Sequence, residues 1–260
     1  MQISLCTDGT NGLQEVLDLY TNSIQVIDLP LDNPRDLPLA CRDHLIRNHP
    51  EADLLSYLED DLVIHDKLYF DKQLWFHAYT NHQFSLMPHR YERVDAGSME
   101  TLMVDGPLDP SFISKFAQPQ TNVAHGQFRD VENVSFDVAS NPHSGTFCVS
   151  REQAQQLQAA ELPRDGFVGP LETAATLTVL HRYPVMKPSL NCWKFLRVEH
   201  GHPSFLRYIN TLPPGCSIQV RDPLQQDGSH RIGWAGSHES VGLSDQTKSP
   251  WHPVPGSMLR

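Results

Sequence analysis

The chain has 260 residues, of which 39% are hydrophobic and 20% are charged, a composition typical of folded globular proteins rather than disordered ones. Its formal net charge of −11 argues against binding to nucleic acid, because a phosphate backbone is held mainly by Lys and Arg. No apolar run approaches the roughly 18 residues that a membrane span needs, and the amino terminus lacks the basic and apolar stretches of a signal peptide. The sequence therefore predicts a soluble, cytoplasmic protein with no transmembrane segment.

Strands and helices are expected to alternate through the first sixty residues. Short β-prone runs end in turn residues, and the segments between them carry apolar residues at helical spacing. The expected strands are 3–7, 23–29 and 53–58, and the expected helices are 13–20 and 37–48. This pattern is typical of a parallel sheet covered by helices, so we expect an α/β fold.

The rest of the chain is patterned less regularly. Helices are expected at 69–79, 151–160, 170–182 and 203–211, and strands at 84–88, 146–149 and 195–198. Residues 95–140 are rich in Pro, Gly and Asn and are expected to form loops with short strands. From residue 213 onward the chain is rich in turn residues, with a hairpin of 217–221 against 231–234 as one option.

The five cysteines are widely spaced and odd in number, with no Cys-x-x-Cys pair. They are Cys6, Cys41, Cys148, Cys192 and Cys216. This spacing does not indicate a disulfide scaffold or a zinc finger, so we expect reduced thiols.

Three adjacent carboxylates, Glu59, Asp60 and Asp61, follow the expected strand 53–58 directly. Ligand sites in open α/β sheets lie at the carboxyl ends of strands. If the chain stays extended, Glu59 and Asp61 face the same side, and two such charges ~4 Å apart repel by about 4 kcal/mol at an effective dielectric near 20. A cation removes that cost, and carboxylate oxygens favour Mg²⁺ or Mn²⁺. The alternative is an ordinary solvated acidic loop.

Roughly residues 1–210 resemble bacterial glycosyltransferases of the GT-A type. The resemblance rests on three blocks, Tyr57-Leu58-Glu59-Asp60-Asp61-Leu62-Val63-Ile64, Leu74-Trp75-Phe76 and Pro88-His89-Arg90-Tyr91-Glu92. It implies one GT-A-like, Rossmann-like domain over 1–212, a mixed sheet flanked by helices, followed by an extension at 213–260. The half at about 1–95 would bind a nucleotide-sugar, a UDP- or GDP-sugar, and the half at about 96–212 would bind a saccharide or lipid-linked acceptor.

The same resemblance assigns roles to the acidic motif. Asp61 would ligate Mn²⁺ or Mg²⁺, and Glu59 would touch the donor's ribose or a metal-bound water. Asp60 completes this donor-binding motif, although it is expected to point away from the other two. Either His200 or His202 would complete the metal shell, or both are exposed turn residues.

Further site residues are expected at strand and helix ends. Thr7 and Asp8 would contact the nucleoside, unless Asp8 with Gly9 simply forms a turn. Glu172, in the first turn of the expected helix 170–182, would be the catalytic base of an inverting enzyme. It can equally stabilise the positive helix end.

Three more polar side chains are candidates for the substrate pocket. His143 and Ser144 would bind the acceptor or the donor sugar, or belong to a surface loop. Arg90 would meet phosphate or an anionic acceptor, or pair with Glu92 on the same strand face.

Two other functions use similar features. A sugar nucleotidyltransferase has the same carboxylate–metal chemistry but usually carries a basic Gly-rich loop after its first strand. Residues 8–12, Asp-Gly-Thr-Asn-Gly, contain no Lys or Arg. The chain can also be a non-catalytic sugar- or partner-binding module of the same fold.

Overall fold

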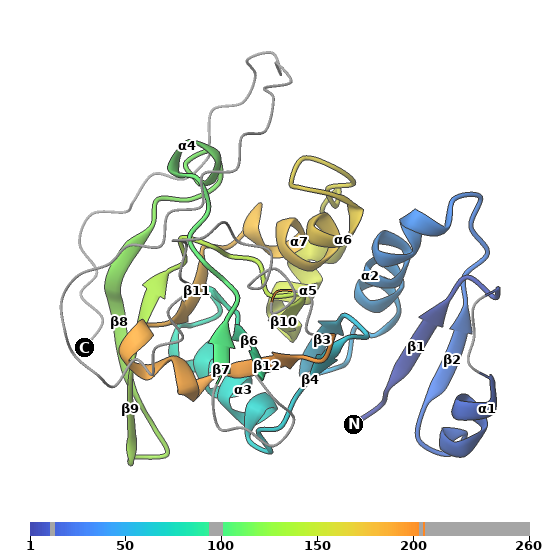
Figure 1. The fold of residues 1–260 in the computed structure, drawn as a ribbon, viewed down its shortest axis with the longest axis horizontal. Coiled ribbons are helices and arrows are strands. Elements are labelled where there is room, and N and C mark those ends of the chain that lie inside the picture. The colour runs from blue at the N-terminus through green and yellow to red at the C-terminus, as the bar shows by residue number, and fades with distance from the viewer. Residues whose placement is uncertain (11–13, 94–100, 203–204, 206–260) are drawn as a thin grey trace, which may run out of the picture.

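The computed structural model describes residues 1–10, 14–93, 101–202 and 205. The helix expected at 203–211 and the hairpin expected beyond residue 213 fall outside these residues, apart from residue 205. The described part is a mixed α/β structure whose strands form four small sheets (Figure 1).

Helices were the best predicted elements. The α-helices are α1 (Gln14–Leu17), α2 (Leu37–Asn48), α3 (Tyr69–Tyr79), α4 (Pro110–Ile113), α5 (Arg151–Gln158), α6 (Pro170–Glu172) and α7 (Thr178–Leu180). Turns of 3-10 helix are η1 (Asp18–Tyr20), η2 (Pro34–Asp36) and η4 (Leu190–Phe195), and η3 (Thr173–Leu177) is a π-helical turn joining α6 to α7. The predicted bounds of α2 and α3 are confirmed, and α5 starts at a capping box between Ser150 and Gln153.

The strands are β1 (Ser4–Thr7), β2 (Gln25–Asp28), β3 (Leu54–Leu58), β4 (Leu62–Val63), β5 (Ser85–Leu86), β6 (His89–Arg93), β7 (Thr101–Met103), β8 (Gln120–Phe128), β9 (Glu132–Val138), β10 (Thr146–Ser150), β11 (Val185–Pro188) and β12 (Arg197–His200). Four strand orders result: β1-β2, β10-β3, β5-β11-β9-β8 and β4-β12-β6-β7.

The first two strands pair in parallel, as the sequence predicts, but β3 does not continue their sheet. It pairs antiparallel with β10, with Leu54 opposite Ser150 and Leu58 opposite Thr146. The expectation of one parallel sheet through all three strands is therefore wrong. Apolar side chains of α2, α5 and α7 cover one face of β3, and those of α3, β8 and β9 cover the other. The strand β10 supplies the backbone partner of β3 between these two clusters.

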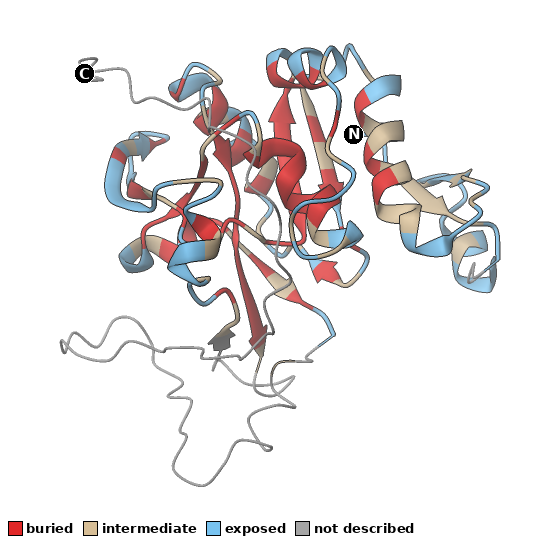
Figure 2. Ribbon diagram, turned by 90° about the horizontal axis from the view of Figure 1, so that it is seen from above, coloured by how far each residue is buried: buried red, intermediate tan, exposed pale blue. Residues whose placement is uncertain are grey.

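Alternate residues of the β3–β10 pair enter two different hydrophobic clusters. Tyr57 and Phe147, stacked with ring centroids 5.5 Å apart, lie in the cluster that includes side chains of α2, α5 and α7. Cys148 lies in the other cluster, with side chains of α3, β8 and β9. Every residue of β10 is buried, whereas β1 and β2 contain no buried residue. Buried segments fill the interior of the molecule in Figure 2.

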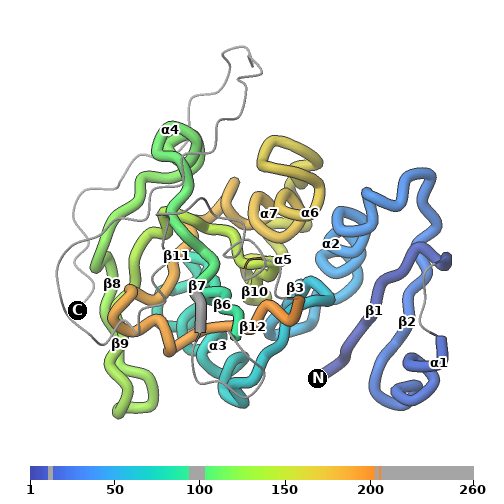
Figure 3. Tube along the Cα trace, viewed as in Figure 1, coloured from blue at the N-terminus to red at the C-terminus, as the bar shows by residue number. Residues whose placement is uncertain are grey.

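Strands from the two halves of the chain pair with each other in three of the four sheets. β5 pairs with β11, and β6 pairs with β12, in both cases in parallel. The Cα trace shows the resulting neighbours, early strands beside late ones (Figure 3). The two expected functional halves therefore share their sheets.

The sequence predicted loops with short strands at 95–140, and this prediction is wrong for residues 120–138. β8 and β9 form a long antiparallel hairpin, in which Phe128 lies opposite Glu132. Its turn places Arg129 at φ 51° and Asp130 at φ 58°, a left-handed pair that Asn-Gly or Asp-Gly usually supplies. Because Arg-Asp is not such a signal, the turn could not be recognised from the sequence.

No helix among the described residues is long and apolar enough to cross a membrane.

Candidate active site

The acidic triplet forms the tight turn between β3 and β4. The Leu62 amide donates to the Glu59 carbonyl over 3.2 Å, so the chain does not stay extended through the triplet as assumed. Glu59 is buried, Asp60 is exposed and Asp61 is half-buried. The turn therefore still separates Asp60 from the other two carboxylates.

Asp61 lies against His200, which β12 brings beside β4. The antiparallel pairing sets His200 opposite Leu62, and the Gly201 amide donates to the Asp61 carbonyl over 2.6 Å. His200 Nε2 is 3.1 Å from Asp61 Oδ2, and His200 Nδ1 is 2.7 Å from Glu92 Oε1. Asp61, His200 and Glu92 thus form a chain of three side chains, whereas His202 is exposed.

Glu59 sits in a confined place beside Gly145. The Glu59 amide donates to the Gly145 carbonyl over 3.0 Å, and a Cβ on Gly145 would lie 2.7 Å from Glu59 Oε2. Burial raises the pKa of Glu59 to about 7, Arg90 opposes this, and the nearby negative charges of Asp61, Glu172 and Asp60 add to it. The carboxylates of Glu59, Asp60, Asp61 and Glu172 and the guanidinium of Arg90 therefore lie within electrostatic range of one another at this strand end.

Two carboxylate oxygens at this strand end are buried without a hydrogen-bond partner, Glu59 Oε1 and Asp61 Oδ1. Buried oxygens of this kind are costly unless something positive pairs with them. Carboxylate oxygens and an imidazole nitrogen are suitable ligands for Mn²⁺. Among the described residues, however, no group of three or more His, Cys, Asp and Glu side chains is arranged to hold a metal ion. The chain itself therefore offers Asp61 and His200 as a two-residue partial site.

A buried ion network that the sequence did not reveal lies next to the site. Arg90 Nε and Lys187 Nζ each lie 2.9 Å from a different carboxylate oxygen of Asp105. Burial works to raise the pKa of Asp105, but Lys187 and Arg90 together hold it well below its usual range. Arg90 pairs with Asp105 rather than with Glu92, so the expected Arg90–Glu92 pair is wrong. A Lys within the apolar run 185–188 was the available signal for this network.

His143 and Ser144 both make internal bonds. His143 Nδ1 is 2.8 Å from Thr176 Oγ1 in η3, and its carbonyl accepts from Lys187 Nζ over 2.8 Å. Burial, with the positive charge of Arg90, lowers the pKa of His143 to about 3. Ser144 is fully buried, and its hydroxyl donates to the Pro88 carbonyl over 2.6 Å. His143 is thus a neutral imidazole close to the site, and Ser144 ties together two chain segments rather than facing a pocket.

Glu172 lies in the first turn of α6, as the sequence predicts, with Pro170 at the first helical position. Its carboxylate curls toward Gly169, where a Cβ would lie 2.9 Å from Glu172 Oε2. Its charge acts on Glu59, so the two carboxylates lie within electrostatic range of each other.

Thr7 is the last residue of β1, and Asp8 follows it. Thr7 Oγ1 accepts from the Gly9 amide over 3.1 Å. Asp8 Oδ1 accepts from the Thr10 amide over 2.9 Å. Both side chains therefore stabilise the turn after β1 in this structure.

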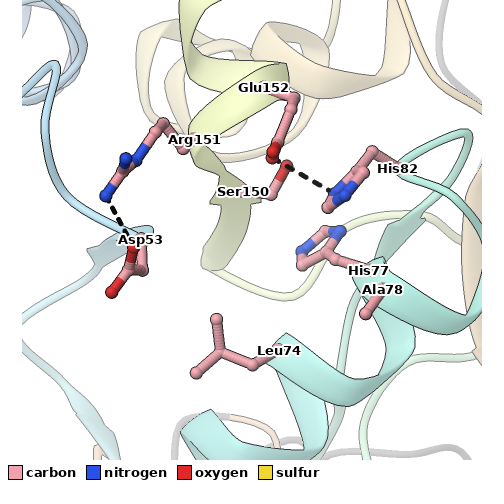
Figure 4. Close-up of a pocket in the computed structure, with 8 residues that line it drawn as sticks. All are labelled: Asp53, Leu74, His77, Ala78, His82, Ser150, Arg151 and Glu152. Atoms are coloured by element: carbon pink, nitrogen blue, oxygen red, sulfur yellow. Dashed lines mark hydrogen bonds and ion pairs between the residues drawn. The ribbon is translucent and has the colours of Figure 1, made fainter.

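A separate cavity of about 390 Å³ lies at the opposite end of β3, between α3 and the start of α5 (Figure 4). Its charged side chains are paired with each other, Arg151 with Asp53 and His82 with Glu152. None of the site residues expected from the sequence is among those that line this cavity.

Neither a protein-family model nor a curated protein matches this chain.

Proposed function

We propose that this protein is a metal-dependent glycosyltransferase that moves a sugar from a nucleotide-sugar to an acceptor hydroxyl. The main support is the pairing of Asp61 with His200 at the carboxyl end of β3, beside two buried carboxylate oxygens without hydrogen-bond partners. Ligands of open α/β sheets bind at the carboxyl ends of strands, and the triplet lies at such an end, although β3 is paired antiparallel with β10. The resemblance of the triplet and its flanking blocks to GT-A enzymes points the same way.

Asp61 and His200 would hold Mn²⁺ or Mg²⁺ together with donor phosphate oxygens, since these ions commonly keep open positions for substrate phosphates. Such an ion would neutralise the charge that develops on the nucleoside-diphosphate leaving group. His200 needs its neutral form to bind metal, and the carboxylate of Glu92 fixes which nitrogen carries the hydrogen. With Nδ1–H donated to Glu92, Nε2 is left with a lone pair toward Asp61.

Glu172 would take the proton from the acceptor hydroxyl as that oxygen attacks the anomeric carbon. It lies in the first turn of α6, and its charge acts on Glu59. Glu59 would stay on the donor side, as an acceptor for a ribose hydroxyl.

The test is release of nucleoside diphosphate from a panel of UDP- and GDP-sugars, measured with Mn²⁺, with Mg²⁺ and with EDTA. Asp61→Asn and Glu199→Gln are compared with the parent. Both changes keep side-chain volume, but Glu199 binds His65 and Arg93 rather than a metal. We expect turnover of one donor class that needs the metal, survives in Glu199→Gln and is lost in Asp61→Asn.

Two results would count against this function. Turnover of a nucleoside triphosphate with a sugar phosphate, releasing pyrophosphate, would identify a nucleotidyltransferase instead. Binding of a sugar or nucleotide-sugar that is unchanged by metal and by Asp61→Asn would identify a binding module.

A further inference from the structure

The cavity between α3 and the start of α5 combines an apolar wall with several polar side chains (Figure 4). Leu74 and Ala78, four residues apart on one side of α3, form the apolar wall, and both are exposed. The cavity volume of about 390 Å³ lies within the roughly 300–1,000 Å³ that is usual for small-molecule sites. The cavity is therefore large enough for a small organic ligand.

His77, also on α3, lines this cavity with a buried ring that lacks hydrogen bonds. The residue is 1% exposed, and neither ring nitrogen has a hydrogen-bond partner among the described residues. The backbone of Cys148 and of Phe84 lies near the ring but makes no hydrogen bond of ordinary geometry with it. Burial, with the charge of His82, lowers the pKa of His77 to about 4, so at pH 7 one ring nitrogen donates and the other accepts. Buried polar groups of this kind are costly unless something pairs with them.

Two further side chains of the cavity wall have a buried nitrogen without a hydrogen bond, Arg151 at Nε and His82 at Nδ1. Arg151 Nη2 lies 2.7 Å from Asp53 Oδ1, and this pair leaves the Nε–H without a partner. His82 Nδ1 lies 3.4 Å from Glu152 Oε2, an ion-pair distance without hydrogen-bond geometry. Several groups with unused hydrogen-bonding capacity therefore surround one cavity.

The chain segment that carries His82 is held in place by hydrogen bonds. Asn81 and His82 have left-handed backbone, with φ 50° and 58°, which is uncommon for residues other than glycine. The His82 amide donates to the His77 carbonyl over 2.8 Å, and Gln153 Nε2 donates to the His82 carbonyl over 3.0 Å. Strained backbone that its surroundings hold in this way clusters at functional sites.

An uncharged ligand with hydroxyl groups suits these side chains. A hydroxyl group both donates and accepts, so neighbouring hydroxyls can pair with either tautomer of His77 and with the Arg151 Nε–H. An anionic ligand would lie beside the carboxylates of Asp53 and Glu152, and a cationic ligand would lie beside Arg151. A sugar ring has hydroxyl groups at its edge and C–H groups on its faces, which matches a polar rim beside an apolar wall.

We propose that this cavity is a binding site for a neutral mono- or disaccharide, whose hydroxyl groups hydrogen-bond to His77 and Arg151. The C–H face of the sugar packs on Leu74 and Ala78. The site lies at the opposite end of β3 from the acidic triplet and does not depend on the proposed function.

Entry of the sugar involves a movement of His82, whose ring lies beside that of His77 (Figure 4). The His77 nitrogens are closed off from water in this structure, so the His82 side chain turns outward as the sugar binds. Its pair with Glu152 is long, and the Glu152 side chain is 56% exposed. Such pairs stabilise a protein little, so the movement has a small cost.

The experiment titrates the full chain, labelled with ¹⁵N in its histidines, with glucose, galactose, mannose, maltose and lactose. EDTA is present and no nucleotide is added. We expect at least one sugar to shift the ring signals of His77 to saturation, and the His77→Gln variant identifies these signals by their loss. Glycine, inorganic phosphate and indole are the charged and apolar comparison ligands. If no sugar shifts the His77 signals, or if a comparison ligand binds as tightly as the best sugar, the proposal is wrong.

A pair of matched variants locates the sugar without disturbing the core. Ala78→Trp fills the cavity from an exposed helix position, so it should weaken sugar binding by about tenfold or more. Ala159→Trp is the control, because Ala159 is also exposed, at the end of α5, and does not line the cavity. Its sugar affinity should equal that of the parent. Equal affinities in both variants would place the sugar elsewhere and overturn the proposal.

Asp61→Asn separates this site from acceptor binding in the candidate active site. Binding that is lost in Asp61→Asn and retained in Ala78→Trp would place the sugar at the acidic turn, which rejects the cavity site and leaves the proposed function standing. Binding that is lost only in Ala78→Trp supports the cavity site, whether or not the protein transfers sugars.

Discussion

His200 Nδ1 lies 2.7 Å from Glu92 Oε1, and both side chains are buried. The carboxylate comes from β6 and the imidazole from β12, two strands paired in parallel. This contact orients the ring so that its other nitrogen faces Asp61.

Replacing Glu92 with Gln should weaken Mn²⁺ binding by about 10- to 100-fold, the usual cost of losing the carboxylate behind a histidine ligand. Calorimetric titration with Mn²⁺ measures the change. Glu199→Gln is the control. Glu199 directly precedes His200 in β12, but it pairs with His65 and Arg93 at the surface. Equal affinities in the two variants would mean that Glu92 does not orient a ligand.

Gly145→Ala should lower the free energy of unfolding by more than the cost of placing alanine in left-handed backbone. Gly145 has φ +66°, where a non-glycine residue costs about 1–2 kcal/mol, and the new Cβ would lie 2.7 Å from Glu59 Oε2. Gly9→Ala is the matched control, because Gly9 has φ +79° with nothing within 4 Å of its Cβ position. Urea unfolding should show the larger loss for Gly145→Ala. Identical losses would show that Glu59 moves aside freely.

The stability of the metal-free protein should fall between pH 4.5 and about pH 7 because of Glu59. Burial raises the folded-state pKa of Glu59 to about 7 from 4.5. The unfolded chain therefore releases this proton first, and stability is lost as pH rises through that window. The loss is on the order of 3 kcal/mol at 1.36 kcal/mol per pKa unit. It is read as the difference between the parent and Glu59→Gln, in urea unfolding series with EDTA. A difference that does not change with pH would contradict this.

Asp105→Asn should be among the most destabilising single changes near the site. It leaves the buried Arg90 and Lys187 without their carboxylate, and breaking a buried ion pair by removing one partner costs about 3–5 kcal/mol. Asp71→Asn is the control, because its pair with Arg129 is about half exposed on both sides and such pairs contribute roughly 0–1 kcal/mol. Chemical denaturation compares the two. Similar small losses would show that Arg90 and Lys187 find other partners.

If Glu172 is the catalytic base, Glu172→Gln should lower kcat by about 10²- to 10⁴-fold while donor affinity stays the same. Glu152→Gln is the control, since Glu152 also lies in the first turn of a helix but lines the distant cavity. Transfer kinetics with saturating donor give the comparison. Full activity in Glu172→Gln would leave Glu172 only its helix-stabilising role.

Local patterns predicted helices better than strand partners. The bounds of α2 and α3 were predicted to the residue because the signals are local. The apolar spacing lies within each helix, and the turn residues lie directly beside its ends. The partner of β3 is β10, about ninety residues later, and no local pattern specifies such a pairing. The β8–β9 hairpin was missed because its turn residues, Arg129 and Asp130, are uncommon in left-handed backbone.

The same contrast applies to the site. The acidic triplet was singled out because it follows a strand, which is a local property, and the resemblance assigned the metal-binding role within it to Asp61. Its contact with His200 depends on β12 pairing with β4, and the roles of Glu92, Asp105 and Lys187 depend on burial at long sequence distance.

The pairing of early strands with late ones has a consequence for synthesis on the ribosome. β3, β4 and β5 obtain their partners β10, β12 and β11 only from residue 146 onward. A nascent chain that ends before that point exposes the apolar faces of β3 and has no backbone partner for it. Folding dominated by such distant pairings is slow, so the acidic turn is assembled among the last features of the molecule. Until then the incomplete chain has unpaired strand edges and exposed apolar surface, which make such intermediates prone to aggregation.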